Sequence, residues 1–433
     1  RNQTAVYIRF QYTSAGWSDG VAIDNIRFYG IKQLNTTFSW SSATPVSGYT
    51  DLACSNLYTN QLVSTIYLKP SLTQMEETSF PIAVTSTLAN GCPISQVITV
   101  ANNSRVWKGL DVVDATNWND VDNWKPAAIP TIDNCVIIPN TAIVKGTAYH
   151  AYAKNLVVKS TGNLNVQPGN TITVKEWVNV NDVAGGVFEL ENTASLVQVD
   201  NVASNNNIGK IKYKRNTSLK RYDYTYLSSP VESQIVNSVT QAPLVTGPVY
   251  KWNPTVGNTN GGYGNWQNAL GDTMETAKGY AVRSPDSFPF TATTYYGLFK
   301  GVPNNGIITI EVSRGPFYYI GPPLLGYNDT EMNTFSDNWN LIGNPYPSSI
   351  RGSQFLLDNQ NEIEGNIRIW THATLPSESQ AQPFYDSFVS NYSPLDYSNY
   401  NFSGTSCCPL SPPELYVGAG QGFFVQMIDG PAT

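Results

Sequence analysis

Two residues in the chain are candidates for acid–base chemistry, His150 and His372, and they are its only histidines. Neither has a metal-ligand partner two or four positions further along. A hydrolytic triad places a histidine between a nucleophile and an orienting carboxylate. The sequence contains no Gly-x-Ser-x-Gly elbow and no Cys–His signature that would supply the nucleophile. We therefore expect both histidines to be ordinary surface or hydrogen-bonded residues, and the chain not to be an enzyme.

A pair of carboxylates, Glu189 and Glu191, is the next candidate, because glycosidases use two such groups. The two alternate along one predicted strand, so they should point to the same face. Strands of secreted proteins often carry solvated pairs of this kind, and this is the interpretation that we favour. Phosphate-binding glycine loops of the P-loop or dinucleotide type are absent from the sequence.

Two groups of oxygen-bearing residues could hold calcium, which prefers carboxylate, amide and carbonyl oxygens. Asp19 and Asp24 form the first, in the context GVAIDNI. The second consists of Asp114, Asn117, Asn119, Asp120, Asp122 and Asn123. This group does not fit an EF-hand loop, since Thr116 and Trp118 occupy its third and fifth positions. Asx turns around buried tryptophans explain the second group better. Asp24 is thus the sharper calcium candidate, and no cofactor is required.

The five cysteines leave one unpaired. Cys54 and Cys92 flank strand-like runs in one module, which predicts a disulfide formed outside the cytoplasm. Such a bridge would stabilise the fold by roughly 3–4 kcal/mol. The adjacent Cys407 and Cys408 could form a strained vicinal bridge, which leaves Cys135 over. No pair has CxxC spacing, so a zinc site is not expected.

The composition indicates extracellular β structure. Only 13% of the residues are charged, about half of the roughly 25% usual in soluble domains. Tyr, Trp, Thr, Asn, Ser and Gly take their place, and these residues suit strands and the turns between them. The net charge of −7 argues against a nucleic-acid partner. No apolar run is long enough to cross a membrane.

The predicted architecture is all-β, with several modules in series. Residues 1–30 resemble the last strands of a truncated jelly roll of the MAM or concanavalin type. Residues 31–105 suggest an immunoglobulin-like β-sandwich. Residues 106–210 combine a Trp-rich stretch with a short β-solenoid, and residues 211–433 suggest a large β-sandwich that is truncated at its C-terminus. Strand patterns at both ends predict that the chain is an internal segment of a longer protein.

The solenoid prediction rests on a short repeat. NLVVKSTG, NLNVQPGN and TITVKEWV begin eight residues apart, at residues 155, 163 and 171, with the same apolar pattern. Short periods with Gly or Asn at the corners are typical of a β-solenoid or of a meander of short strands. The indoles between residues 107 and 124 are expected to close the end of this domain.

Several stretches of residues 106–433 resemble large surface proteins of gliding Bacteroidetes-type bacteria, which the type IX secretion system exports. They are VWKGLDVVDATNWNDVDNWKPAAIPTIDNCVIIP, RYDYTYLSSPV, WNLIGNPYPSSI, NIRIWTH, DYSNYNFSG and AGQGFFVQM. The resemblance implies export, display at the cell surface and a role in adhesion, as in gliding-motility adhesins. The same modules also accompany secreted enzymes.

We therefore expect a non-catalytic structural or adhesive segment of a large secreted cell-surface protein, such as an adhesin of gliding motility or a surface filament. Its partners would be neighbouring domains of the same chain and an extracellular glycan or protein ligand. The alternative is a set of accessory modules of a secreted polysaccharide- or protein-degrading enzyme whose catalytic domain lies outside this segment. The complete open reading frame would discriminate between the two.

Overall fold

The chain was analysed as a computed structural model, and its description covers part of the sequence. The described residues are 37–42, 46–87, 92–238, 248–257, 263–315, 324–325, 331–332, 338–374, 392–393, 396–401, 404–405 and 414–428. Strands account for 46% of the structure and helices for 6%, which confirms the all-β prediction. No helix among these residues is long and apolar enough to span a membrane. The jelly-roll strands predicted for residues 1–30 lie outside the described residues.

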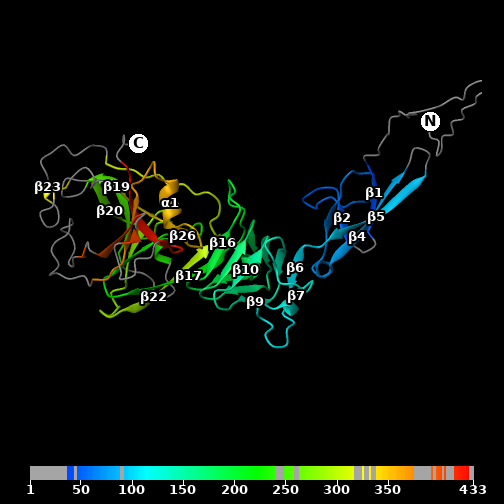
Figure 1. Ribbon diagram of the computed structural model, residues 1–433, viewed down its shortest axis with the longest axis horizontal. Coiled ribbons are helices and arrows are strands. Elements are labelled where there is room, and N and C mark those ends of the chain that lie inside the picture. Colours follow the sequence, from blue (N-terminus) through cyan, green and yellow to red (C-terminus); the bar gives the residue numbers. More distant parts are fainter. Residues whose placement is uncertain are drawn as a thin grey trace, which may run out of the picture. The chain divides into compact units, whose positions relative to one another are not determined.

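The chain divides into two compact units, Arg1–Asn103 and Ser104–Thr433 (Figure 1). The first contains β1 (Ser39–Ser42), β2 (Ser47–Tyr49), β3 (Tyr67–Lys69), the 3-10 turn η1 (Gln74–Glu76), β4 (Ser79–Thr87) and β5 (Pro93–Ala101). These strands form an antiparallel sheet in the order β1-β4-β5 and a separate β2-β3 pair. Phe80 and Ile82 of β4 are buried, whereas every side chain of β5 is exposed. The described strands therefore establish β structure here, but not the immunoglobulin-like topology.

The second unit begins with a β-solenoid of about four turns, which confirms that prediction. Its elements are β6 (Ser104–Trp107), η2 (Val121–Asn123), β7 (Trp124–Lys125), β8 (Cys135–Ile138), β9 (Thr141–Val144), β10 (His150–Ala153), β11 (Asn155–Val158), β12 (Asn163–Val166), β13 (Thr171–Val174), β14 (Val178–Val180), η3 (Asp182–Ala184), β15 (Val187–Leu190) and β16 (Ser195–Gln198). Parallel pairing places β8, β11 and β14 in one sheet, β9, β12 and β15 in a second, and β10, β13 and β16 in a third.

The side chains of successive coils stack in register. Leu156 lies between Val136 and Val178, because β11 pairs with β8 on one side and with β14 on the other. All three side chains are fully buried. Strands that begin eight residues apart in the sequence are not hydrogen-bonded neighbours in one sheet. Instead it carries the chain from Leu156 to Leu164 and Ile172, which occupy the three sheets of a single coil.

The Trp-rich stretch closes the N-terminal end of the solenoid, as predicted. β6 extends the first sheet by pairing with β8, and Asn117 forms a parallel bridge with Ile143 of the second. Trp107, Trp118 and Trp124 are fully buried against this end. Their rings meet edge to face, with Trp124 centred 4.9 Å from Trp107 and 4.7 Å from Trp118. The indoles thus cover apolar side chains that the first coil would otherwise expose.

The solenoid continues directly into the rest of the unit. β17 (Ile211–Leu219) pairs in parallel with β15 and antiparallel with β22 (Thr293–Gly301). One sheet therefore runs across the boundary predicted at residue 210. Along β17, Ile211 and Tyr213 are buried while Lys212 and Lys214 are partly exposed, which is the alternation of a strand with one buried face.

Two further sheets complete the unit. The first has the order β18-β21-β19-β20 and consists of β18 (Tyr224–Leu227), β19 (Val249–Gly257), β20 (Tyr263–Asn268) and β21 (Tyr280–Arg283). The second has the order β25-β31-β27-β28-β29 and consists of β25 (Trp339–Gly343), β27 (Asn366–Trp370), β28 (Tyr397–Asn401), β29 (Gly404–Thr405) and β31 (Gly422–Gln426). Smaller elements are η4 (Val236–Ser238), β23 (Leu324–Leu325), β24 (Glu331–Met332), β26 (Ile350–Arg351), α1 (Gly352–Asp358) and β30 (Tyr416–Val417).

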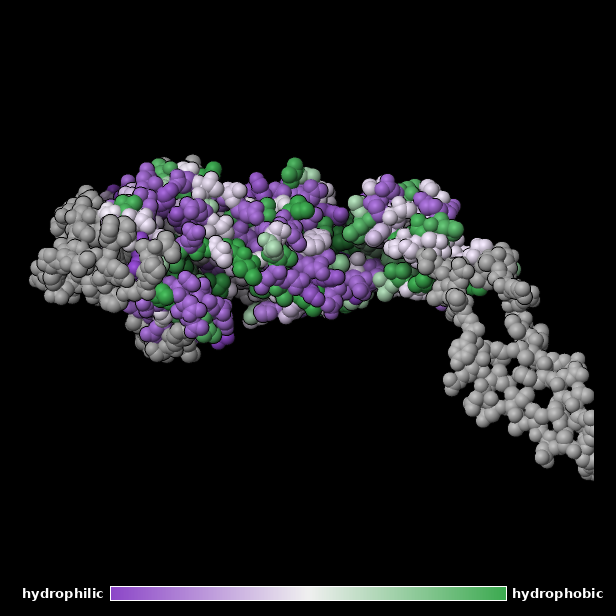
Figure 2. Space-filling model, turned by 90° about the horizontal axis from the view of Figure 1, so that it is seen from above, coloured by the Kyte–Doolittle hydropathy of each residue, from purple (hydrophilic) through white to green (hydrophobic). Residues whose placement is uncertain are grey.

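The strand β31 separates two cores. Phe423 and Val425 face α1 and Leu356, while Phe424 faces Tyr226 and Leu341 on the other side. This alternation follows from the period of two along a strand, and it explains why the three consecutive residues Phe423, Phe424 and Val425 are all apolar. On the outer surface, apolar groups are dispersed among polar ones on the face seen in Figure 2.

Candidate functional site

The predicted cysteine bridge is not formed, and the described residues contain no disulfide. Cys54 lies in the turn after β2, while Cys92 lies just before β5. The two strands belong to different sheets of the first unit, which the spacing in the sequence could not reveal. Cys135 begins β8, where burial raises the pKa of its thiol. Cys407, Cys408, Asp19 and Asp24 lie outside the described residues, so the vicinal bridge and the first calcium site stay predictions.

The second acidic group folds into Asx turns, as expected. The side-chain oxygens of Asp114, Asn117 and Asp120 each accept a hydrogen bond from the backbone N–H two residues further on. Asn123 is fully buried, and its amide donates to the carbonyls of Asp114 and Asn117. These polar residues therefore hold the loop that carries the buried indoles.

One acidic cluster of this loop was missed by the sequence analysis, because Asp111 was not among the candidates. Carboxylate oxygens of Asp111, Asp120 and Asp122 lie within 4.8 Å of one another. Asp111 and Asp120 already accept backbone N–H groups of the same loop. The cluster is therefore explained as part of the turn structure.

Acid should weaken this loop through Asp114. The pKa of its carboxyl falls from 3.8 to about 2, because Lys145 Nζ lies 2.5 Å away and the Thr116 hydroxyl also donates to it. A lowered folded-state pKa gives stability that is present above the ordinary pKa and is lost as the pH falls through the folded one. We therefore expect Asp114→Asn to lower the melting temperature at neutral pH, with a difference from the parent that shrinks between about pH 4 and pH 2.

Thermal melting followed by circular dichroism at several pH values measures this difference. Asp133→Asn removes an exposed carboxylate in the nearby turn before β8 and serves as the control. A constant difference between Asp114→Asn and the parent across that range would contradict the explanation.

Glu189 and Glu191 do point the same way, as their alternation predicts. Lys214 Nζ lies 2.6 Å from a Glu189 oxygen and 2.8 Å from a Glu191 oxygen. Lys214 belongs to β17, the strand that follows β15 in the sheet. The two carboxylates therefore neutralise a lysine and tie the last coil to β17.

A set of aromatic rings lies where the β18-β21-β19-β20 sheet faces the β25-β31-β27-β28-β29 sheet. We call it the aromatic cluster; it comprises Tyr224, Tyr226, Tyr250, Trp252, Trp266, Trp339, Trp370, Tyr392, Tyr397 and Phe424. Tyr226 stacks on Trp370, with centroids 6.1 Å apart, and its hydroxyl lies 2.7 Å from that of Tyr397. Except for Tyr226 and Phe424, these residues are half-buried. The cluster is thus a packed set of rings whose residues keep a minor exposed fraction.

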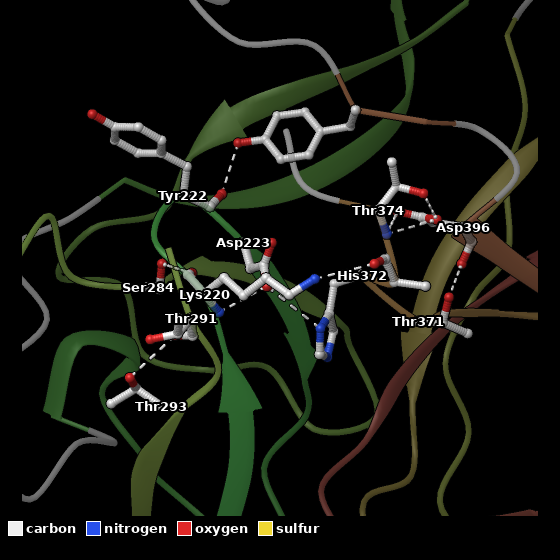
Figure 3. A network of polar contacts seen from close by, with 12 residues as sticks. Lys220, Tyr222, Asp223, Ser284, Thr291, Thr293, Thr371, His372, Thr374 and Asp396 are labelled. Atoms are coloured by element: carbon white, nitrogen blue, oxygen red, sulfur yellow. Dashed lines mark hydrogen bonds and ion pairs between the residues drawn. The ribbon is translucent and has the colours of Figure 1, made fainter. Parts of the chain in front are cut away.

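A network of polar groups adjoins the aromatic cluster at the ends of β18, β21 and β27 (Figure 3). Asp223 is 1% exposed, and its Oδ2 lies 3.6 Å from His372 Nδ1 and accepts the backbone N–H of Lys220. Asp223 Oδ1 is buried and has no hydrogen-bond partner among the described residues. His372 itself has a left-handed backbone, with φ of 43°. The two residues are 149 positions apart, so only the fold brings them together.

Residues of further loops connect this polar network to the aromatic cluster through hydrogen bonds and a ring contact. Asp396 accepts hydrogen bonds from Thr374, and its carbonyl accepts the hydroxyl of Thr371. The hydroxyl of Tyr392 donates to the carbonyl of Tyr222, while its ring meets Tyr224 edge to face. The network therefore forms a polar rim beside partly exposed rings.

The nearby hydroxyl groups are turned to structural partners. Ser284 is fully buried and donates to the carbonyl of Lys220, and Thr371 donates to that of Asp396. His372 faces the Asp223 carboxylate with one ring nitrogen. The other histidine, His150, is exposed at the start of β10.

A comparison with protein families matches residues 106–433 to the model described as Domain of unknown function (DUF8693). This chain belongs to the DUF8693 family. The matched region begins within two residues of Ser104, where the second compact unit starts. The DUF8693 region thus includes the solenoid, the aromatic cluster and the polar network in one unit. No curated protein and no solved structure matches the chain.

The aromatic cluster of the DUF8693 region was not predicted from the sequence. One signal was available, because Tyr222, Tyr224 and Tyr226 alternate in RYDYTY and therefore share one face of a strand. Trp339 and Trp370 come from strands more than a hundred residues later. Their convergence depends on sheet packing, which periodicity along the chain does not report.

Proposed function

We propose that this chain is a non-catalytic structural and adhesive segment of a large secreted cell-surface protein. The all-β architecture and the low content of charged residues support this assignment. In this proposal residues 31–105 form an immunoglobulin-like module, and the two facing sheets of the DUF8693 region form a β-sandwich. The solenoid would serve as a rigid spacer, and export by the type IX system, with a role in gliding or surface attachment, rests on the sequence resemblance described above.

The observation that carries the adhesive role is the aromatic cluster with its polar rim. Partly exposed Tyr and Trp rings offer flat apolar faces that can stack on sugar rings. The imidazole of His372, which lies beside these rings, can supply a directional hydrogen bond that fixes a ligand's orientation. The ligand of this segment is thus proposed to be an extracellular saccharide that contacts the aromatic cluster.

The second candidate is a set of accessory modules of a secreted polysaccharide-degrading enzyme. The same aromatic surface favours it, because a saccharide-binding module can hold a catalytic domain on its substrate. The complete open reading frame separates the two roles. Long arrays of β modules would favour the adhesin, and an intact hydrolase domain would favour the enzyme.

Removal of Trp339 tests the binding role. Trp339 begins β25, an edge strand, and only its backbone carbonyl accepts the indole N–H of Trp252, so this bond survives in Trp339→Ala. Because the ring supplies stacking surface, we expect the variant to lose roughly tenfold in affinity for the polysaccharide that the parent binds. Affinity electrophoresis of the full chain through gels containing a panel of polysaccharides measures this.

The matched control is Tyr296→Ala, which removes a ring that is 52% exposed on β22, outside the aromatic cluster. It should migrate as the parent does. If the parent is retarded by no polysaccharide, or if both variants lose retardation equally, the aromatic cluster is not the binding surface.

A further inference from the structure

Three side chains on one face of β27 each carry a buried polar atom that has no hydrogen-bond partner among the described residues. They are Asn366 Oδ1, Arg368 Nε and Trp370 Nε1, which follow one another at every second residue. Alternate residues of a strand point to the same face, so these atoms form a row. A buried polar group without a partner is costly, and native proteins explain such groups by bound water, ions or ligands. A row of three such atoms on one face therefore points to a bound water, ion or ligand as their missing partner.

The middle member of the row, Arg368, carries a positive charge that forms no ion pair with the described residues. The Arg368 guanidinium lies 4.0 Å from the centre of the Trp339 ring, and within the described ranges no carboxylate interacts with it. Burial lowers the pKa of Arg368, which reflects the cost of removing this cation from water. Arginine presents a planar fork of donors that matches a carboxylate, and its flat face can stack on an indole.

Strand register shows what lies on either side of these three β27 side chains. On one side the aromatic cluster packs on the sheet, and on the other side the neighbouring side chains are exposed to solvent. Arg368 lies opposite Phe424 on one side, where the aromatic cluster covers the sheet. On the other side it lies opposite Asn399, and Asn366 lies opposite Asn401; both of these asparagines are exposed. A ligand on the open side would therefore reach Arg368 and the edge of the aromatic cluster together.

We propose that this face of β27 binds an acidic saccharide, a polymer of uronic acid units, with a sugar carboxylate paired to Arg368. The assignment rests on the proposed function, because it names the chemical class of saccharide for the same aromatic cluster. The carboxylate receives the guanidinium hydrogen bonds, and the sugar ring lies against the neighbouring aromatic rings. Binding is non-covalent, and asparagine side chains along the open part of the sheet offer further hydrogen bonds to sugar hydroxyls.

Polygalacturonate and its methyl ester provide a matched pair of probes, because they differ only at the carboxyl group, which is charged in the first and a neutral ester in the second. With the full chain in isothermal titration calorimetry, we expect polygalacturonate to bind roughly tenfold or more tightly than the ester. Added salt should weaken binding of polygalacturonate and leave that of the ester nearly unchanged. Arg368→Gln should abolish the preference between the probes, and Arg368→Lys should retain part of it.

Lys300→Gln is the control for net charge, since it removes an exposed cation of β22 and should leave the preference intact. Equal affinity for the two probes, with no effect of Arg368→Gln, would overturn the acidic-saccharide assignment while leaving saccharide binding in place. Binding of neither probe nor any neutral polysaccharide would overturn the proposed function as well. The comparison of the two probes needs no variant, so it remains decisive if Arg368→Gln does not fold.

Discussion

Replacing Trp124 by alanine will lower the free energy of unfolding of the second unit by about 3–5 kcal/mol, the usual cost of deleting a large aromatic side chain from a core. Trp124 is fully buried and lies between Trp107 and Trp118. Its indole N–H also donates to the carbonyl of Trp118, at 2.9 Å. The substitution therefore opens a cavity at the end of the solenoid and leaves a buried carbonyl without its donor.

Urea unfolding followed by far-UV circular dichroism measures this loss without depending on the fluorescence of the deleted indole. Val113→Ala is the matched control, because Val113 belongs to the same loop but is 90% exposed. Its effect should stay within about 0.5 kcal/mol. An unfolding midpoint of Trp124→Ala equal to that of the parent would show that the indoles do not stabilise the solenoid end.

Replacing Gly209 by alanine is expected to destabilise the junction between the solenoid and β17 by about 3 kcal/mol or more. Gly209 has φ of +78°, in the left-handed region that favours glycine. A Cβ there would lie only 1.8 Å from the carbonyl oxygen of Val180. This carbonyl is backbone of the last strand of the first sheet, so the chain itself would have to move.

Gly169→Ala distinguishes the cost of the left-handed backbone from the cost of the steric clash with Val180. Gly169 has a similar φ of +74°, but nothing lies within 4 Å of its added Cβ. It should cost only the left-handed backbone strain, about 1–2 kcal/mol. Both variants can be compared by thermal and urea unfolding of the full chain. Equal losses would mean that the close approach of Gly209 to Val180 is not what stabilises the junction.

The solenoid could be predicted because its signal is local. Leu156, Leu164 and Ile172 recur at a spacing that a strand and a corner require. The coil itself was harder to see, since the residues stacked in one row, Val136, Leu156 and Val178, are 20 and 22 positions apart and separated by corners of different length. The apolar pattern therefore predicted the element type, while the coil length depended on how each corner turns.

The candidate site could not be predicted in the same way, because its members come from distant strands. Asp223 and His372 meet only because β18 begins close to where β27 ends. The cysteine prediction was wrong for a related reason: proximity in the sequence did not tell which sheet each thiol joins. Periodicity thus indicated which residues share one face of a strand. Which strand faces pack against each other became clear only from the three-dimensional structure.

Because the coils stack on one another, the solenoid can become longer or shorter by one whole coil at a time. Each coil uses 20 to 24 residues and advances the solenoid by one strand spacing, about 4.8 Å. Adding or removing a whole coil would keep every buried row continuous, because each row repeats the same kind of side chain. The indoles at one end and β17 at the other would then move apart or together in fixed steps. Evolution could in this way adjust the length of the solenoid without redesigning either of its ends.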